Sequence, residues 1–309
     1  MKMKNYMNRE SNWNAHIMII VAAMLWGIIG IFTRPLNSEG FTAIQLTGLR
    51  CIVSAVFLGM DIFCTDRSRL KIEIKDLWWF ICMGIFSILF FNICYFTTIR
   101  LSTLAVASVL LYTAPYFVVI LSFFVFGEPL TWRKIFSLLL SFGGCMLVVG
   151  VGKGPLQLTA ILSGIGAGFG YALFSIFGRI ASRKYHPLTI NFYTFMVAAI
   201  CIIPFSGFDS SVVKLCNNWN NIINVLSLGI VSTAVPFWLY TAGLRHVESG
   251  KAAIMAFIEP FVASAVGVCV FQEALTGWNL IGMFLIAFSI CLLNSPIKGR
   301  KAKSRKLQV

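Results

Sequence analysis

The sequence contains little charge. Asp, Glu, Lys and Arg make up only 12% of its 309 residues, whereas 58% are hydrophobic, and the mean hydropathy is +0.85. A soluble globular domain of this length needs a larger share of polar side chains to cover its surface. The scarcity of charge therefore argues against such a domain and predicts that the chain lies in lipid.

Histidine is also scarce, and no cluster of metal-binding residues is visible. The three histidines, His16, His186 and His246, stand far apart, and neither a His-Glu-x-x-His nor a Cys-x-x-Cys run occurs. The nine cysteines lie mostly in apolar stretches, where we interpret them as small buried side chains rather than disulfides or ligands. The sequence thus predicts no metal site, no catalytic residue and no intramembrane protease chemistry.

The glycine motifs that bind nucleotides are missing as well. The glycine-rich stretch 164–170 lacks the G-x-G-x-x-G spacing, and Gly152-Lys153-Gly154 lacks both the Ser or Thr and the upstream glycine of a phosphate-binding loop. Glycines four residues apart, as in 164–170, are instead typical of membrane helices that pack closely. We therefore expect this chain to bind neither ATP nor another cofactor.

Long apolar runs occupy most of the chain. Each is close to the roughly 20 residues that a helix needs to cross the hydrocarbon core, and the runs are continuous rather than alternating, which excludes a barrel. The sequence predicts an all-α integral membrane fold. Its ten transmembrane helices are expected at residues 15–33, 41–63, 77–98, 101–124, 133–151, 158–180, 187–205, 222–243, 250–271 and 278–296.

The ten predicted helices form two copies of one unit. Residues 95–131 align without a gap on residues 240–276, at a constant offset of 145. The positions identical in both copies are Tyr95/Tyr240, Arg100/Arg245, Ala107/Ala252, Pro115/Pro260, Val125/Val270, Phe126/Phe271, Glu128/Glu273, Leu130/Leu275 and Thr131/Thr276. Because five spans is an odd number, the second copy enters the membrane from the opposite side, as in the inverted repeats of alternating-access transporters. We place the repeats at 1–152 and 153–309, joined at residues 152–155.

The distribution of basic residues predicts the orientation. With the N-terminus inside, twenty Lys and Arg residues fall in cytoplasmic loops and termini, six of them in the tail at 298–306, and four fall outside. This asymmetry predicts a multi-pass protein of the plasma (inner) membrane with both termini in the cytoplasm. Contact with anionic lipid headgroups accounts for the net charge of +14, so no nucleic acid is expected as a partner.

The repeated motifs resemble those of a known family. Pro115 and Gly127-Glu128-x-Leu130-Thr131 recur as Glu259-Pro260 and Glu273-x-Leu275-Thr276, and Leu25-Trp26-Gly27 opens the first copy. This pattern resembles the EamA-type branch of the drug/metabolite transporter superfamily over almost the whole chain. The resemblance implies two inverted five-helix halves around a central cavity, and export of amino acids, other metabolites or toxic compounds. The second copy departs from the first by having Gln272 in place of Gly127.

The residues that are identical in both copies of the repeat are interpreted as structural scaffold. Glu128 and Glu273 precede Thr131 and Thr276 at the predicted starts of the next helices, where a hydroxyl caps the helix and a carboxylate complements its dipole. Proline has no N–H to donate, so Pro115 and Pro260, which fall inside spans, are predicted to kink their helices.

Two charges break the repeat. Arg50 aligns with Met196 and Glu259 with Ala114, so the shared scaffold requires neither, although both fall well inside predicted spans, where a charge is costly. One interpretation is structural: the two residues form an ion pair, or Arg50 extends toward the interface. The other is functional, with Glu259 carrying a proton or binding a substrate ammonium.

The resemblance further implies that helices 1, 3, 4, 6, 8 and 9 face the cavity. Aromatic and amide side chains on these helices are candidates to bind an amphipathic substrate together with Glu259, and packing between helices is the alternative. The candidates are Trp26, Asn92, Tyr95, Tyr112, Tyr171, Trp238 and Tyr240.

The function predicted from these features is secondary transport. We expect export of small organic metabolites, such as amino acids or related amines, by alternating access, with a multidrug or organic-cation exporter as the alternative. A lipid-processing membrane enzyme, the alternative from another class, would need a cluster of catalytic groups at one interface. The expected partners are the substrate and membrane lipid, and the protein is expected to be a monomer or homodimer.

Overall fold

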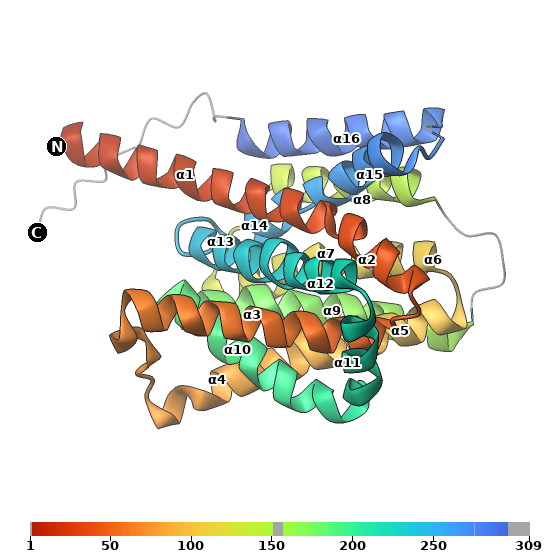
Figure 1. Cartoon of the computed structure of the whole chain (residues 1–309). Helices are drawn as coiled ribbons and strands as arrows, with labels where there is room; N and C mark the ends of the chain where they lie inside the picture. Colours follow the sequence, from red (N-terminus) through yellow and green to blue (C-terminus); the bar gives the residue numbers. More distant parts are fainter. Residues whose placement is uncertain (1, 151–156, 275, 296–309) are drawn as a thin grey trace, which may run out of the picture.

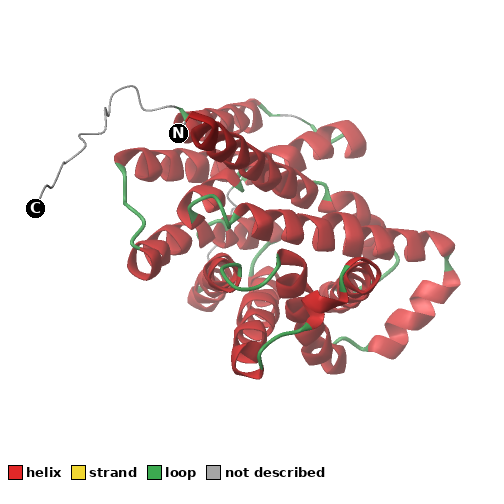
Figure 2. Ribbon diagram, turned by 90° about the vertical axis from the view of Figure 1, so that its left-hand side faces the viewer, coloured by secondary structure: helices red, strands yellow, loops and turns green. Residues whose placement is uncertain are grey.

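The computed structural model describes residues 2–150, 157–274 and 276–295, which are mostly helical and contain no β-strand (Figure 2). Ten helical segments in these ranges are long and apolar enough to cross a membrane, and each overlaps one of the ten spans predicted from the sequence. They are Trp13–Ser38, Ala43–Thr65, Ile74–Leu101, Leu104–Phe126, Trp132–Val149, Leu158–Ala181, Pro187–Phe205, Trp219–Gly243, Ser249–Phe271 and Gly277–Asn294. The predicted joint at 152–155 and the basic tail at 298–306 lie outside the described residues.

The described chain divides into named helices, which Figure 1 colours along the sequence. The first repeat contains α1 (Lys2–Gly27), α2 (Ile29–Ser38), α3 (Ala43–Thr65), α4 (Leu77–Cys82), α5 (Phe91–Leu101), α6 (Leu104–Leu111), α7 (Ala114–Phe126) and α8 (Trp132–Val149). The second contains α9 (Leu158–Ala181), α10 (Pro187–Ile202), α11 (Phe208–Asn217), α12 (Trp219–Gly229), α13 (Val235–Gly243), α14 (Ser249–Met255), α15 (Ile258–Phe271) and α16 (Gly277–Asn294). Helix α1 begins and α16 ends at the same face of the bundle, which we call the terminal face (Figure 1).

One span in each repeat contains a π-helical segment. Met83–Phe90 joins α4 to α5, and Ile230–Ala234 joins α12 to α13. The two segments correspond at the repeat offset of 145. Because π-helical turns widen a helix locally and are frequent at functional sites, both mark the third span of each repeat as a region of irregular backbone.

The following span is broken in each repeat. Helix α6 is separated from α7 at residues 112–113, and α14 from α15 at residues 256–257. Pro115 is the second residue of α7 and Pro260 the third of α15, positions where a helical N–H has no partner within the helix. The structure therefore has a full break in both spans, just before the prolines at which the sequence predicts kinks.

The two repeats pack against each other through corresponding helices. Helix α8 lies along α16, and α3 lies along α10, on opposite sides of the bundle (Figure 1). At the α8–α16 contact the backbones almost touch, because a Cβ atom added to Gly144 would lie 2.7 Å from the carbonyl oxygen of Gly282. The hydroxyls of Ser141 and Ser289 hydrogen-bond in the same contact. Small residues thus permit close approach between membrane helices.

This contact gives a first prediction, on stability. Gly144→Ala should destabilise the protein by about 1–3 kcal/mol, because the new methyl group meets backbone that cannot move aside easily. Gly143→Ala is the matched control, since a Cβ atom there has no neighbour within 4 Å. Thermal unfolding of the two purified variants in detergent measures the difference. Equal unfolding temperatures would show that the α8–α16 contact is looser than described.

Candidate functional site

An internal pocket lies where the two broken spans meet. The pocket is narrow, with a cavity volume of about 20 Å³, and residues on both sides of each break line it. Most of its wall is apolar, with a few polar side chains among the lining residues. Those polar residues are Tyr112, Tyr171, Ser175, Tyr240 and Glu259, and the apolar ones include Pro115. The pocket thus has the composition of a small-molecule site, mainly apolar with a few polar groups that converge.

Glu259 owes its position to the break in its span. It lies in the first turn of α15, and its backbone N–H donates to the carbonyl of Ala256 at 3.0 Å, which closes the turn before Pro260. Helix α1 covers this turn closely, because a Cβ atom on Gly27 would lie 2.8 Å from the carbonyl oxygen of Glu259. Tyr112, at the break in the first repeat, lines the same pocket as Glu259. The breaks of both repeats therefore meet at this carboxylate.

Among the described residues, the carboxylate of Glu259 has no cationic partner within ion-pair distance. Every ion pair in the described part of the chain involves other acidic residues. An unpaired carboxylate inside a membrane protein is costly, so its presence indicates a functional partner such as a proton or a cationic ligand.

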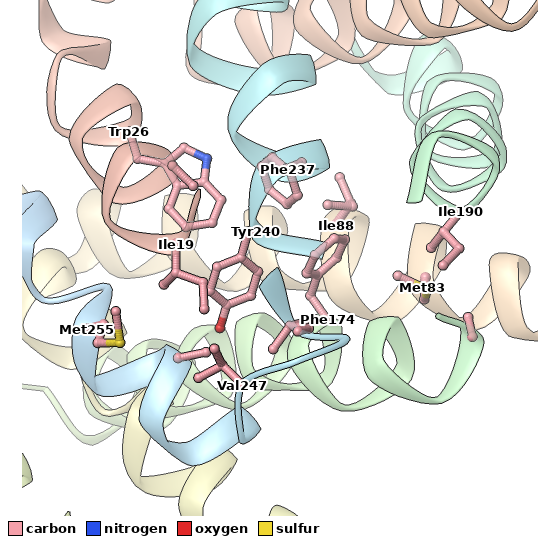
Figure 3. Close-up of a cluster of buried hydrophobic side chains, with 14 of the residues drawn as sticks. Ile19, Trp26, Met83, Ile88, Phe174, Ile190, Phe237, Tyr240, Val247 and Met255 are labelled. Atoms are coloured by element: carbon pink, nitrogen blue, oxygen red, sulfur yellow. The ribbon is translucent and has the colours of Figure 1, made fainter. Parts of the chain in front are cut away.

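Aromatic side chains form one side of the site. Trp26 is almost fully buried, and its ring centroid lies 5.1 Å from that of Phe237, 5.4 Å from Tyr240 and 6.3 Å from Tyr171. Figure 3 shows Trp26, Phe237 and Tyr240 gathered between their helices. The Tyr240 hydroxyl hydrogen-bonds that of Ser175 at 2.9 Å, and the indole N–H of Trp26 is buried without a hydrogen-bond partner in the described part of the chain. Trp26 therefore stands beside two tyrosines that line the pocket and has one hydrogen bond still to donate.

Arg50 is held by an amide and not by an acid. Its Nη2 lies 3.5 Å from Oδ1 of Asn92, while its Nε is buried and has no hydrogen-bond partner among the residues that the structure describes. Asn92 itself is fixed, since its Nδ2 donates to the carbonyl of Ile88 at 2.7 Å and Thr47 donates to its Oδ1. Among the described residues no ion pair joins Arg50 to Glu259, so the pairing that the structural interpretation offers is not made in this structure. The guanidinium of Arg50 can therefore donate a further hydrogen bond to another group.

Only some of the residues that the sequence predicts to bind substrate line the pocket. Tyr112, Tyr171, Tyr240 and Glu259 line it, and Trp26 contacts two of these tyrosines. Three other candidates lie elsewhere: Asn92 holds Arg50, the Tyr95 hydroxyl hydrogen-bonds Ser108 at 3.2 Å, and Trp238 packs against the main hydrophobic core. Ser175 lines the pocket although the sequence does not single it out, because a serine within an apolar helix carries no distinctive signal.

Comparison with known proteins agrees with this architecture. The model of the EamA-like transporter family matches residues 13–150 and, again, residues 158–295. The chain belongs to this family. An uncharacterized transporter of Archaeoglobus fulgidus is 29% identical to it over 89% of this chain and 94% of its own length. The uncharacterized transporter YxxF of Bacillus subtilis is 28% identical over 81% and 79% of the two chains.

A solved crystal structure has the same fold. It superposes with a TM-score of 0.75 and covers 91% of this chain and 96% of its own, at 19% sequence identity. Together with the twofold family match, this establishes a multi-pass membrane transporter built as an inverted repeat. The EamA-like transporter therefore has its pocket between the two repeats, where such architectures bind substrates.

A second polar cluster of the EamA-like transporter lies at the terminal face. Glu128 is only 5% exposed, and its carboxylate accepts hydrogen bonds from the backbone N–H groups of Ser249, at 2.7 Å, and Gly250, at 3.1 Å. It also forms ion pairs with Arg179 and Lys134. Glu128, which follows α7 in the first repeat, thus holds the start of α14 in the second.

This contact corrects the expected role of Glu128. The sequence suggests that its carboxylate complements the helix that follows it, which is α8. In the structure Thr131 alone caps α8, by accepting from the N–H of Lys134 at 3.3 Å, and Thr276 caps α16 in the same way. The carboxylate acts across the repeats instead, on α14.

Lys134 connects Glu128 to a second acid. Its ammonium is 2% exposed and lies 2.7 Å from a carboxylate oxygen of Glu248, the residue before α14. Burial by itself would raise the pKa of Glu248, but the charges of Lys134, Lys251 and Arg179 hold it below its usual value. Two carboxylates and their cations thus join the repeats at the terminal face.

Proposed function

We propose that this EamA-like transporter exports small organic metabolites that carry an amine, such as amino acids, across the plasma membrane by alternating access. The observation that carries the proposal is the unpaired carboxylate of Glu259 in an aromatic-lined pocket at two helix breaks. A substrate ammonium would supply the missing counter-charge. The relatives, which are named transporters, favour transport over lipid processing.

The pocket offers a cation two kinds of interaction. The carboxylate of Glu259 can accept charge-assisted hydrogen bonds from an ammonium, with Tyr112 beside it to orient the carboxylate. The rings of Tyr171 and Tyr240, which also line the pocket, can attract the same charge by cation–π contact. The apolar remainder of the wall suits a hydrophobic side chain of the substrate.

Arg50 favours an amino acid over a simple amine. Its guanidinium contacts Asn92 on α5, and the neighbouring Phe91 packs against Tyr171, which lines the pocket together with Glu259. The buried Nε of Arg50 and the indole N–H of Trp26 are unused donors suited to a carboxylate. A molecule with both an ammonium and a carboxylate therefore complements this region, whereas an organic cation would leave Arg50 uncompensated.

Competition between related compounds tests the substrate class. Uptake of a radiolabelled amino acid into liposomes that contain the purified protein should be inhibited by other amino acids. N-acetyl amino acids, which lack the ammonium, should inhibit poorly. Inhibition by cationic dyes but not by any amino acid would replace this proposal with the organic-cation exporter.

The orientation that we propose for the protein in the membrane places the terminal face in the cytoplasm. The described cytoplasmic loops would then contain most of the basic residues, as the positive-inside rule requires. A reporter that is active only outside the cytoplasm should be inactive when fused after Val309 and active when inserted after Gly40, between α2 and α3. The reverse pattern would show that the chain lies the other way round in the membrane.

A further inference from the structure

The cluster around Glu128 has a counterpart at the opposite face. Glu128, Arg179 and Phe126 form the docked cluster, and the residues 145 positions away from them, Glu273, Arg34 and Phe271, form the free cluster. In each cluster the arginine pairs with the glutamate and covers the phenylalanine ring, at 4.8 Å in the docked cluster and 4.0 Å in the free cluster. The same two contacts are thus made twice.

The backbone of the two clusters corresponds as well. The N–H of Glu128 donates to the carbonyl of Ser122, and the N–H of Glu273 donates to that of Gly267, again 145 residues on. The preceding residues, Gly127 and Gln272, both adopt left-handed backbone with φ of 65° and 54°. Gln272 is a non-glycine residue in this strained region, so the turn that places Glu273 is retained at a cost.

The two clusters differ in their exposure and in their contact with a neighbouring helix. Glu128 is buried against the start of α14, whereas the side chains of Glu273 and Arg34 are 50% and 49% exposed. The helix that corresponds to α14 is α6, and the residues that match Ser249 and Gly250 are Leu104 and Ala105. In the described chain the N–H groups of Leu104 and Ala105 have no hydrogen-bond partner, although Thr103 already caps the next N–H, that of Val106.

We propose that the two clusters are alternating latches of the transport cycle. In the state described here, Glu128 holds α14 and closes the terminal face. In the other state Glu273 accepts hydrogen bonds from the N–H groups of Leu104 and Ala105 and closes the opposite face, while Glu128 releases α14. This inference rests on the proposed alternating access and identifies the residues that exchange.

The latched helices lead directly to the substrate site. Helix α14 ends at the break before Glu259, and α6 ends at the break that contains Tyr112. Residues of both helices also line the pocket, Leu111 on α6 and Ala253 on α14. Movement of either helix start is therefore transmitted to the pocket through a short rigid segment, which couples each latch to access from one side.

The two latches are not equally strong. The docked cluster has an additional buried cation, Lys134, and the residue that matches it is the neutral Asn279, which caps α16 together with Thr276. Likewise, Glu248 before α14 is matched by Thr103 before α6. The closed terminal face should therefore be the more populated state in the absence of substrate.

Hydrogen–deuterium exchange of the two helix starts tests the proposal. In the wild type we expect slow exchange at 249–254 and fast exchange at 103–108. Glu128→Gln should speed exchange at 249–254 and slow it at 103–108, each by roughly tenfold, the effect expected for weakening hydrogen bonds to a charged group. The double variant with Glu273→Gln should exchange fast at both. Thr131→Ala, which removes a cap outside the latch, should leave 103–108 unchanged.

A purely structural role of Glu128 gives a different result. Faster exchange at 249–254 with no slowing at 103–108 would overturn the latch. Glu273→Gln supplies an independent test at an exposed position, where a surface ion pair by itself contributes little to stability. It should slow transport severalfold and leave the unfolding temperature unchanged, and undiminished transport would contradict the proposal. Because exchange is measured without substrate, this outcome is separate from the identity of the metabolite.

Discussion

The Glu259→Gln variant is expected to insert and purify like the wild type and to lose most of its transport. Glutamine keeps the volume of the side chain and removes its charge and its proton. A hydrogen bond to a charged group contributes about 1.5–3 kcal/mol, so affinity for an amine substrate should fall by about 10- to 100-fold. Any dependence of uptake on an imposed pH gradient should also vanish, because no titratable group would remain at this position.

Two controls separate this role from a structural one. Tyr112→Phe removes only the hydroxyl beside the carboxylate and should weaken transport less than Glu259→Gln does. The repeat mate of Glu259 is Ala114, so the scaffold tolerates an uncharged residue at this place and the variant should fold. Full transport with unchanged pH dependence in Glu259→Gln would exclude both the ammonium-binding and the proton-carrying role.

Arg50→Met is expected to change which substrates are carried. Methionine is the residue that the second repeat has at the matching position, so it should pack without a large loss of stability. Loss of the guanidinium should lower affinity for amino acids by about tenfold or more while affinity for their methyl esters, which lack the carboxylate charge, stays nearly constant. Competition by the two compound series measures the difference.

A second variant and two alternative outcomes show whether Arg50 contacts the substrate. Asn92 holds Arg50 through a single long contact, so Asn92→Ala should release the guanidinium and weaken amino-acid binding less than Arg50→Met does. If Arg50→Met affects amino acids and their esters equally, Arg50 does not contact the substrate carboxylate. If it unfolds the protein, Arg50 is part of the scaffold.

The fold could be predicted from the sequence because its determinants are local. Ten apolar runs of sufficient length and one internal duplication suffice to place the spans, and two prolines indicate the irregular positions next to Pro115 and Pro260. Membrane insertion removes most alternatives, since an exposed backbone must be hydrogen-bonded within its own helix. The internal repeat then predicts that the two halves have the same fold in inverted orientations, and no tertiary contact is needed for this prediction.

The site was only partly predictable. In a membrane both the lipid-facing and the buried sides of a helix are apolar, so sequence periodicity does not tell which way Tyr95 or Trp238 faces. For the same reason Ser175 gives no signal. The partners of Arg50 and Glu259 depend on the relative rotation of α3 and α15, which no local pattern specifies.

Glu128 illustrates a further limit. Its repetition as Glu273 predicts a shared scaffold element, yet the contact that Glu128 makes joins residues 121 positions apart. The same sequence motif also lies in two different environments, because Glu128 is buried and Glu273 is half exposed. A duplicated motif specifies which contacts are possible in both halves, and only the structure shows which half makes them in a given state.

Solute counterflow tests the central claim most directly, namely that this protein exchanges an amine-bearing metabolite through a site at Glu259. Liposomes that contain the purified protein are loaded with an unlabelled amino acid and diluted into a trace of the same labelled compound. We predict transient accumulation of label above equilibrium with the wild type, and none with Glu259→Gln or with empty liposomes. Equal accumulation by wild type and Glu259→Gln, or no accumulation by the wild type with any amino acid, would contradict the account.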